Sequence, residues 1–345
     1  MPELPEVETA VRDLNKTILG RKIEDVWSDA RKIVKHPKTF GKFRKIIIGK
    51  RIEKVSRKAK NILIEFSSGE ILLIHQKMTG HLLVGNWELK NSAWKPVRSG
   101  PLDDPMNRFL HLIFWLDDGR MLALSDLRKF AKVLLMDSVK LFQIPELANL
   151  GPDALDKSFT GDKLKQILKL EKGKIKQVLM DQEVISGIGN IYSDEILWAA
   201  RIHPSRKACG LDSKEVGLIY ASMVEILNKA IKLKGDSMSD YRLITGEKGS
   251  FQDVQNVYQR EGKSCLRKDG GIILRIKIGG RSAHFCPKCQ KMKLRGLTPA
   301  VSLRGLSPSG SKTSPFSAER NPPKQKIGIH SRSYGRGFLR RRIKL

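Results

Sequence analysis

The feature that most constrains the fold is a change in hydrophobic periodicity near residue 137. Before it, short apolar runs are separated by turn signals, and two hairpins are predicted over 60–75 and 111–124. Over 161–235, apolar residues recur every three or four positions, as on one face of a helix. Several short strands followed by helices indicate an α+β protein, with a β-sandwich first and a helical domain second.

Punctuating residues and composition divide this pattern into domains. An amphipathic helix opens the chain, because Val7, Ala10, Leu14 and Ile18 recur at helical spacing. Prolines and glycines then mark a hinge between the strands and the helices. The predicted sandwich domain covers 1–136 and includes the leading helix, and a hinge over 137–160 follows it. The helical domain covers 161–256, and its last part is a polar, mobile loop. A cysteine-containing β-hairpin finger over 257–290 and a basic disordered tail over 291–345 complete the chain.

Two residues at the start of the chain carry a candidate chemistry. If Met1 is removed, Pro2 presents a secondary amine near the positive end of the opening helix. Reference pKa values of α-amino groups are roughly 7.7–8.0, so a sizeable fraction of such an amine is unprotonated near neutral pH. The amine can attack an electrophilic carbon and form an iminium, and Glu3 stands beside it to move protons. The alternative is an ordinary exposed chain end.

The charge balance favours a polyanionic partner. Among 345 residues, 65 are Lys or Arg and 36 are Asp or Glu, which gives a net charge of +29. The segment 291–345 holds fourteen of these basic residues and a single acid, Glu319, yet the rest of the chain is still strongly basic. Nucleic acid is therefore the expected partner. Since no apolar run could span a membrane and the start is unlike a signal peptide, we expect a cytoplasmic, nucleoid-associated monomer.

Two further segments carry binding signals. The turn 187–190, Gly-Ile-Gly-Asn, predicts a helix N-terminus whose backbone N–H groups suit a phosphate. Cys286 and Cys289 have the spacing of a zinc knuckle. The matching first pair is incomplete, because Lys268 follows Cys265 at the position where a second cysteine is expected.

Four segments, in this order and over about 1–290, resemble the formamidopyrimidine-DNA glycosylase/endonuclease VIII family of base-excision repair enzymes. They are residues 2–9, 57–60, 180–204 and the finger. The resemblance implies a β-sandwich, a helix–two-turn–helix domain, a zinc-finger-like hairpin and damaged double-stranded DNA as partner. Leu4 follows Glu3 where a glycine could stand, and in this respect the sequence resembles the branch of the family that removes oxidised purines, such as 8-oxoguanine and formamidopyrimidines. The alternatives are removal of oxidised pyrimidines, or binding of lesions without cutting.

The resemblance also implies a mechanism. In this family the damaged base leaves the stack, and the amine that corresponds to Pro2 attacks sugar C1′ to give an iminium. Glu3 corresponds to the general acid, Lys60 to the lysine that assists the first phosphate elimination, and Arg281 to the finger arginine of the second. Taken alone, Lys60 would be interpreted as one more solvated charge on a basic strand, and the family register reverses that interpretation.

Further positions correspond to the family's DNA contacts. Met78, Arg128 and Phe130 correspond to side chains that fill the gap left by the flipped base, although each could be an ordinary core or surface residue. The segment 239–252 corresponds to the loop that covers the lesion. The implied phosphate contacts are Lys176, Asn190, Arg281 and Lys172. Phe109 replaces a DNA-contacting histidine of the family, and His111 nearby is retained as a DNA-binding candidate.

The finger departs from the family's four cysteines. Cys265, Cys286 and Cys289 form one zinc site per monomer if either Asp269 or His284 completes it, and otherwise the hairpin folds without metal. The basic tail lies outside the resemblance. It is either a non-specific DNA tether or a dispensable extension.

Overall fold

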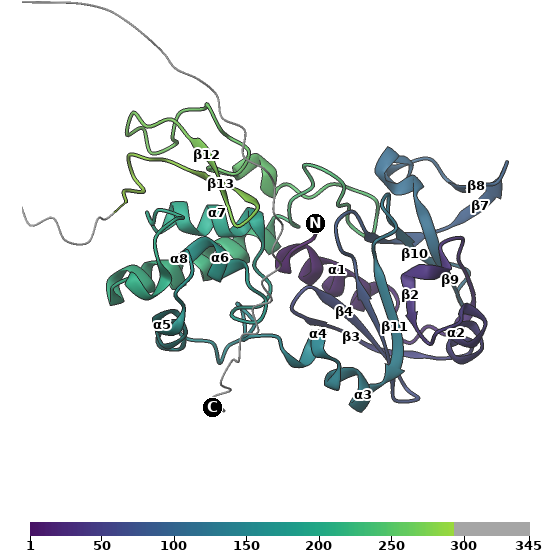
Figure 1. The fold of residues 1–345 in the computed structure, drawn as a ribbon. Coiled ribbons are helices and arrows are strands. Elements are labelled where there is room, and N and C mark those ends of the chain that lie inside the picture. The colour runs from purple at the N-terminus through teal and green to yellow at the C-terminus, as the bar shows by residue number, and fades with distance from the viewer. Residues whose placement is uncertain (293–345) are drawn as a thin grey trace, which may run out of the picture. The chain divides into compact units, whose positions relative to one another are not determined.

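The computed structural model describes residues 1–292, so the predicted basic tail beyond Met292 lies outside the described residues. The α-helices are α1 (Leu4–Thr17), α2 (Phe40–Ile47), α3 (Ser138–Gln143), α4 (Pro145–Ala148), α5 (Gly161–Leu170), α6 (Ile175–Met180), α7 (Asn190–Ala199) and α8 (Ser213–Lys232). The strands are β1 (Ile23–Trp27), β2 (Val34–His36), β3 (Ile52–Lys58), β4 (Asn61–Phe66), β5 (Glu70–His75), β6 (His81–Gly85), β7 (Trp87–Lys90), β8 (Ala93–Pro96), β9 (Leu110–Leu116), β10 (Met121–Ser125), β11 (Lys132–Asp137), β12 (Leu274–Ile278) and β13 (Arg281–Phe285) (Figure 1).

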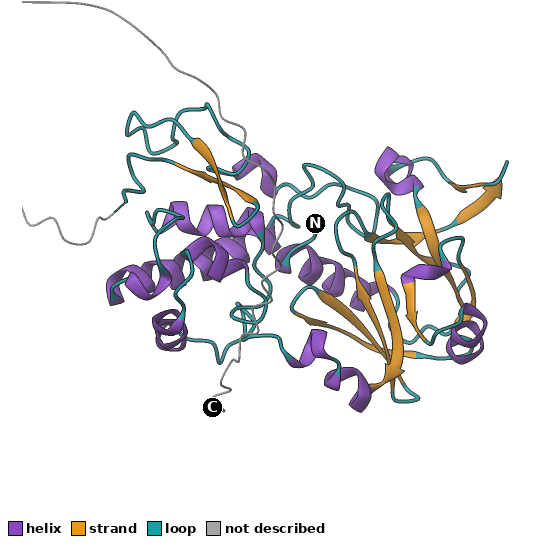
Figure 2. Cartoon of the chain, in the orientation of Figure 1, coloured by secondary structure: helices purple, strands orange, loops and turns teal. Residues whose placement is uncertain are grey.

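Most of the strands form a sandwich and the helices α5–α8 follow it in the chain, which confirms the predicted α+β class (Figure 2). The sandwich consists of a sheet in the order β1-β9-β10-β6 and a second in the order β2-β11-β5-β4-β3. Alternate residues of both sheets face one shared core, among them Phe114 and Leu122 from the first sheet and Ile62 and Ile74 from the second. The two predicted hairpins are confirmed as β4–β5 and β9–β10.

The outer face of the five-stranded sheet is covered as well, which explains why its strands are apolar on both sides. Leu63 and Leu73 point outward and pack with Leu141 of α3 and Leu147 of α4. These two helices occupy the first half of the segment 137–160. That half therefore belongs to the sandwich rather than to a hinge, and only the second half runs on toward α5.

One helix in the β region, α2, is not predicted by the periodicity. It begins after Thr39, whose hydroxyl accepts a hydrogen bond from Lys42 N (3.3 Å). Phe43 and Ile47 are fully buried on its inner face in the sandwich core. With only two turns, α2 offers too few repeats for its spacing to stand out from the flanking strand patterns.

Helix α1 joins the two domains. Val7, Ala10 and Leu14 pack in the sandwich core, whereas Leu4 packs in the core that α5–α8 build. The amide of Leu4 donates to Gly187 O (3.0 Å), which ties the first helical residue to the turn before α7. The start of the chain is therefore enclosed between the sandwich and the helical domain.

The finger is the β12–β13 hairpin, and it packs against α7. Gly279 and Gly280 form its turn, and both have positive φ, which favours glycine. Among residues 1–292, no helix is long and apolar enough to cross a membrane.

Candidate active site

A pocket of about 440 Å³ opens beside the start of α1. Its walls come from segments far apart in the chain: the N-terminus, the β3–β4 turn, the loop after β5, the start of α7, the loop after α8 and the finger turn. The four residues predicted to be catalytic line this pocket together. They are Pro2, Glu3, Lys60 and Arg281, and the predicted DNA contacts Met78 and Asn190 line it with them.

Glu3 is held at the N-terminus of α7. Its carboxylate accepts hydrogen bonds from Gly189 N (2.6 Å) and Ile191 N (3.0 Å). Position 189 must be glycine for this approach, because a Cβ there would lie 2.4 Å from the carboxyl carbon of Glu3. The sequence predicts that the backbone N–H groups of this turn suit a phosphate. Because a helix N-terminus stabilises any anion, two of these groups instead hold the carboxylate of Glu3.

Lys60 lies at the tip of the β3–β4 turn and is only 6% exposed. Its Nζ donates to Ile188 O (2.7 Å). Burial lowers the pKa of Lys60, the charges of Glu3 and Glu6 oppose that effect, and nearby Arg281 adds to it. A lowered pKa makes the neutral amine, the form that accepts a proton, more accessible than in a solvated lysine. The alternative of a solvated surface charge is therefore wrong.

Glu6 is a pocket residue that the sequence analysis missed. Its carboxylate accepts hydrogen bonds from Tyr192 OH (2.5 Å), Asp236 N (2.8 Å) and Glu3 N (2.7 Å). Burial, followed by the charge of Glu3, raises the pKa of Glu6 to about 7. Glu6 lies three residues after Glu3, which is a sequence signal for a helix start. That signal explains the hydrogen bond from Glu3 N to the Glu6 carboxylate, but it does not predict that Glu6 is buried.

Glu6 should make the stability of the protein depend on pH. Its pKa is about 7 in the folded chain against an ordinary value of 4.5, so the folded state holds the extra proton between these values. The free energy of unfolding therefore falls as the pH rises from 4.5 to 7, by about 3 kcal/mol from this group. Glu6→Gln has no proton to lose, so thermal unfolding should show this slope only in the wild type. Parallel curves for the two proteins would contradict the prediction.

Three predicted DNA-wedge residues lie on two loops that are tied together. Buried Asp126 accepts hydrogen bonds from Ala131 N (2.8 Å) and from the hydroxyl of Thr79, the neighbour of Met78. Arg128 N donates to the same hydroxyl (3.1 Å). The Arg128 guanidinium lies over the ring of Phe130, 4.5 Å from its centroid, and Phe130 is 52% exposed. The ring of Phe130 is thus exposed and held against the Arg128 guanidinium, on a loop that is tied to the one carrying Met78.

Two of the predicted DNA contacts, Lys176 and His111, are buried. Lys176 is fully buried with its Nζ 2.5 Å from Asp194 Oδ1, so its charge is neutralised inside the protein and a direct phosphate contact is not supported. His111 is 8% exposed, and its Nδ1 lies 2.8 Å from Asp29 Oδ1. Lys172, in contrast, is exposed.

The segment 239–252, predicted to be a polar covering loop, is anchored to the sandwich. Arg242 forms a two-point ion pair with Asp104, at 2.9 and 3.0 Å. The carbonyl of Ile244 accepts a hydrogen bond from Val84 N (2.7 Å). Ser239, at the start of the segment, lines the pocket, so the anchored part and the pocket-facing part are adjacent in the chain.

The finger brings four metal-ligand groups together. One ligand atom from each of Cys265, Asp269, Cys286 and Cys289 lies within 4.8 Å of the others, and Cys286 Sγ is 3.5 Å from an Asp269 oxygen. Ligands around a tetrahedral zinc with bonds of about 2.0–2.3 Å are separated by roughly 3.5 Å, so this set fits zinc. The ring of His284 is turned to Asp194 instead (2.9 Å), so of the two predicted alternatives only Asp269 completes the cluster.

Comparisons with known proteins cover the whole described chain. Three family models match: the formamidopyrimidine-DNA glycosylase N-terminal domain over 1–133, the H2TH domain of the same enzyme over 150–242, and a zinc finger found in that enzyme and in isoleucyl-tRNA synthetase over 270–291. The fold and the pocket thus define a DNA glycosylase of base-excision repair.

Whole-chain relatives agree with the family models. The formamidopyrimidine-DNA glycosylases of Desulforamulus reducens and Heliobacterium modesticaldum are 36% and 39% identical, over 85% and 84% of this chain and the full length of each relative. Solved structures of the Lactococcus lactis enzyme with abasic-site DNA and with Fapy-dG-containing DNA are 32% identical, cover 84% of this chain and all of theirs, and have TM-scores of 0.73 and 0.72. The chain belongs to the formamidopyrimidine-DNA glycosylase family, which confirms the resemblance in the sequence.

Proposed function

We propose that the protein binds damaged duplex DNA, removes oxidised purines from it and cuts the backbone at the resulting abasic site. The observation that carries this proposal is the convergence of Pro2, Glu3, Lys60 and Arg281 on one pocket. An amine, a carboxyl group, a lysine of lowered pKa and a fixed cation are the groups that the two reactions require. The Lactococcus lactis relative has been solved on DNA that contains an abasic site and on DNA that contains Fapy-dG, which supports the same substrate class.

In the first reaction the freed nitrogen of Pro2 attacks sugar C1′ of the flipped nucleotide. The bond between C1′ and the base breaks, and Glu3 donates the proton that base loss and sugar ring opening require. An iminium then links Pro2 to the sugar. Met78, Arg128 and Phe130 fill the gap that the base leaves in the stack.

In the second reaction the iminium acidifies the hydrogen on C2′. Lys60 assists removal of this proton, and the electron pair expels the 3′ phosphate. Arg281 assists a further elimination that expels the 5′ phosphate, so both ends of the gap carry phosphate. Water then hydrolyses the iminium, which frees the Pro2 amine and releases the sugar fragment as an aldehyde. Backbone phosphates are contacted by Asn190, Arg281 and Lys172, which hold the DNA without reading its sequence.

Incision of matched duplexes tests the substrate class. Duplexes with a single 8-oxoguanine or a single thymine glycol are incubated with the protein, and we expect faster cutting of the 8-oxoguanine strand. Faster cutting of the thymine glycol strand would contradict the proposal and indicate an activity on oxidised pyrimidines. Tight binding to both duplexes without cutting would show a lesion-binding protein.

We also propose that the finger cluster binds one zinc ion per chain. Metal analysis of the purified protein should find close to one equivalent. Asp269→Ala removes one ligand from the cluster and should lose zinc to a chelator faster than the wild type, whereas His284→Asn should not. Zinc well below one equivalent in the wild type would refute the site.

A further inference from the structure

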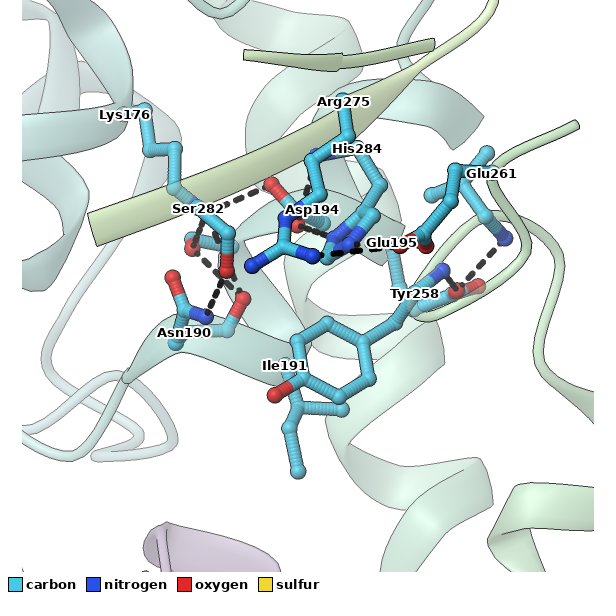
Figure 3. A network of polar contacts seen from close by, with 12 residues as sticks. Lys176, Asn190, Ile191, Asp194, Glu195, Tyr258, Glu261, Arg275, Ser282 and His284 are labelled. Carbon is cyan, nitrogen blue, oxygen red and sulfur yellow. Dashed lines mark hydrogen bonds and ion pairs between the residues drawn. The ribbon is translucent and has the colours of Figure 1, made fainter. Parts of the chain in front are cut away.

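A buried charged network joins α7 to the finger (Figure 3). Asp194 on α7 is 1% exposed, and its Oδ1 lies 2.5 Å from Lys176 Nζ. Its Oδ2 accepts two hydrogen bonds from His284, one from the backbone N and one from the ring Nδ1, each 2.9 Å. Because a carboxylate only accepts, Nδ1 carries a ring hydrogen in this contact. The Nε2 of the same ring lies 3.4 Å from Glu261.

This network lies between the two sides of the pocket. Asp194 is one helical turn after Asn190, which lines the pocket at the start of α7. His284 is three residues after Arg281 on the five-residue strand β13. The contact therefore connects the helix whose N-terminus holds Glu3 with the strand that begins at Arg281.

The neighbouring acid holds the other end of the finger. Glu195 accepts hydrogen bonds from Val257 N (2.8 Å) and Tyr258 N (3.0 Å), where the chain enters the finger. Two consecutive residues of α7 thus hold both the entering chain and the returning strand. The side chain of Arg281 is itself exposed, so the backbone of β13 determines where that side chain begins.

We propose that Asp194 and His284 form a lock between α7 and β13 that positions Arg281 over the pocket, and that this lock determines how often the first elimination continues to the second. The inference rests on the proposed function. Asp194 and His284 are positioning residues, since neither lines the pocket. Burial of a carboxylate costs free energy unless its hydrogen bonds are made. Displacement of β13 would break the bonds from His284 to Asp194, so the observed position of β13 against α7 is favoured.

A matched pair of variants tests the lock. His284→Leu and His284→Asn have nearly the same shape, but only Asn restores a donor near the position of Nδ1. On abasic-site DNA, we measure the ratio of doubly to singly eliminated product, together with borohydride trapping and zinc content. We expect His284→Leu to lower the product ratio by about three- to a hundredfold, the range of couplings between contacting residues. His284→Asn should recover most of it, with trapping and zinc unchanged in both.

The outcomes separate the inference from the proposed function. Absence of trapping in the wild type would refute the proposed function itself. With trapping intact, an unchanged product ratio in His284→Leu would overturn the lock. Equal losses in the Leu and Asn variants, or a loss of zinc or trapping in His284→Leu, would also overturn it, because the hydrogen bond would then not be the cause.

Discussion

Borohydride should trap a covalent complex with abasic-site DNA from a chain that begins at Pro2, and only background from a chain in which another residue precedes Pro2. A free secondary amine can form an iminium that borohydride reduces to a stable link, whereas an amide nitrogen cannot. Pro2 is buried and lines the pocket beside Glu3, whereas Met1, the residue before it, is 40% exposed.

The comparison uses one protein released from a cleavable fusion in two forms, with Pro2 or with an added glycine as the first residue. Both forms keep every pocket side chain from Pro2 onward. Pro2→Gly provides a third form that keeps a terminal amine but loses the ring, and we expect its trapping to be slower. Equal trapping of all three forms would exclude Pro2 as the nucleophile.

Glu3→Gln should slow release of an oxidised purine by about 10²–10⁴-fold, the usual contribution of a general acid. The same variant should still be trapped on DNA with a preformed abasic site, where no base has to leave. The amide retains an acceptor for one of the N–H groups at Gly189 and Ile191, but its NH₂ faces the other, so a lower melting temperature is also expected.

Glu8→Gln is the matched control for this experiment. Glu8 lies on the same helix, but its carboxylate pairs with Arg57 (2.8 Å) and does not line the pocket. It should lose some stability and keep base release. A similar loss of base release in both variants would mean that Glu3 acts through the fold rather than as an acid.

What could be predicted from the sequence depends on short segments. The start of the chain, the β3–β4 turn, the turn before α7 and the cysteine knuckle each carry their information within a few residues. The family resemblance sets these segments in register, and the structure brings Pro2, Glu3, Lys60 and Arg281 to one pocket. Local patterns sufficed there because each residue is fixed by a turn or a helix end.

The rest depends on partners that only the tertiary fold supplies. Lys176 looks like a phosphate contact until Asp194, eighteen residues later on another helix, is found against it. In the sequence, Glu6 indicates only the start of a helix. Its raised pKa comes from burial, which the sequence around it does not reveal. Asp269 and His284 are equivalent candidates in the sequence, and hydrogen bonding of His284 to Asp194 separates them.

The placement of α1 between two cores has a consequence for how the protein is made. The walls that enclose Pro2 and Glu3 include residues 187–191 and 235–241, which are synthesised long after the first helix. Since domains fold as they emerge, the N-terminus stays open to an aminopeptidase until those residues arrive. Met1 remains 40% exposed after folding, whereas Pro2 is buried, so these late-made walls cover the nucleophile more completely than the residue that must be removed from it.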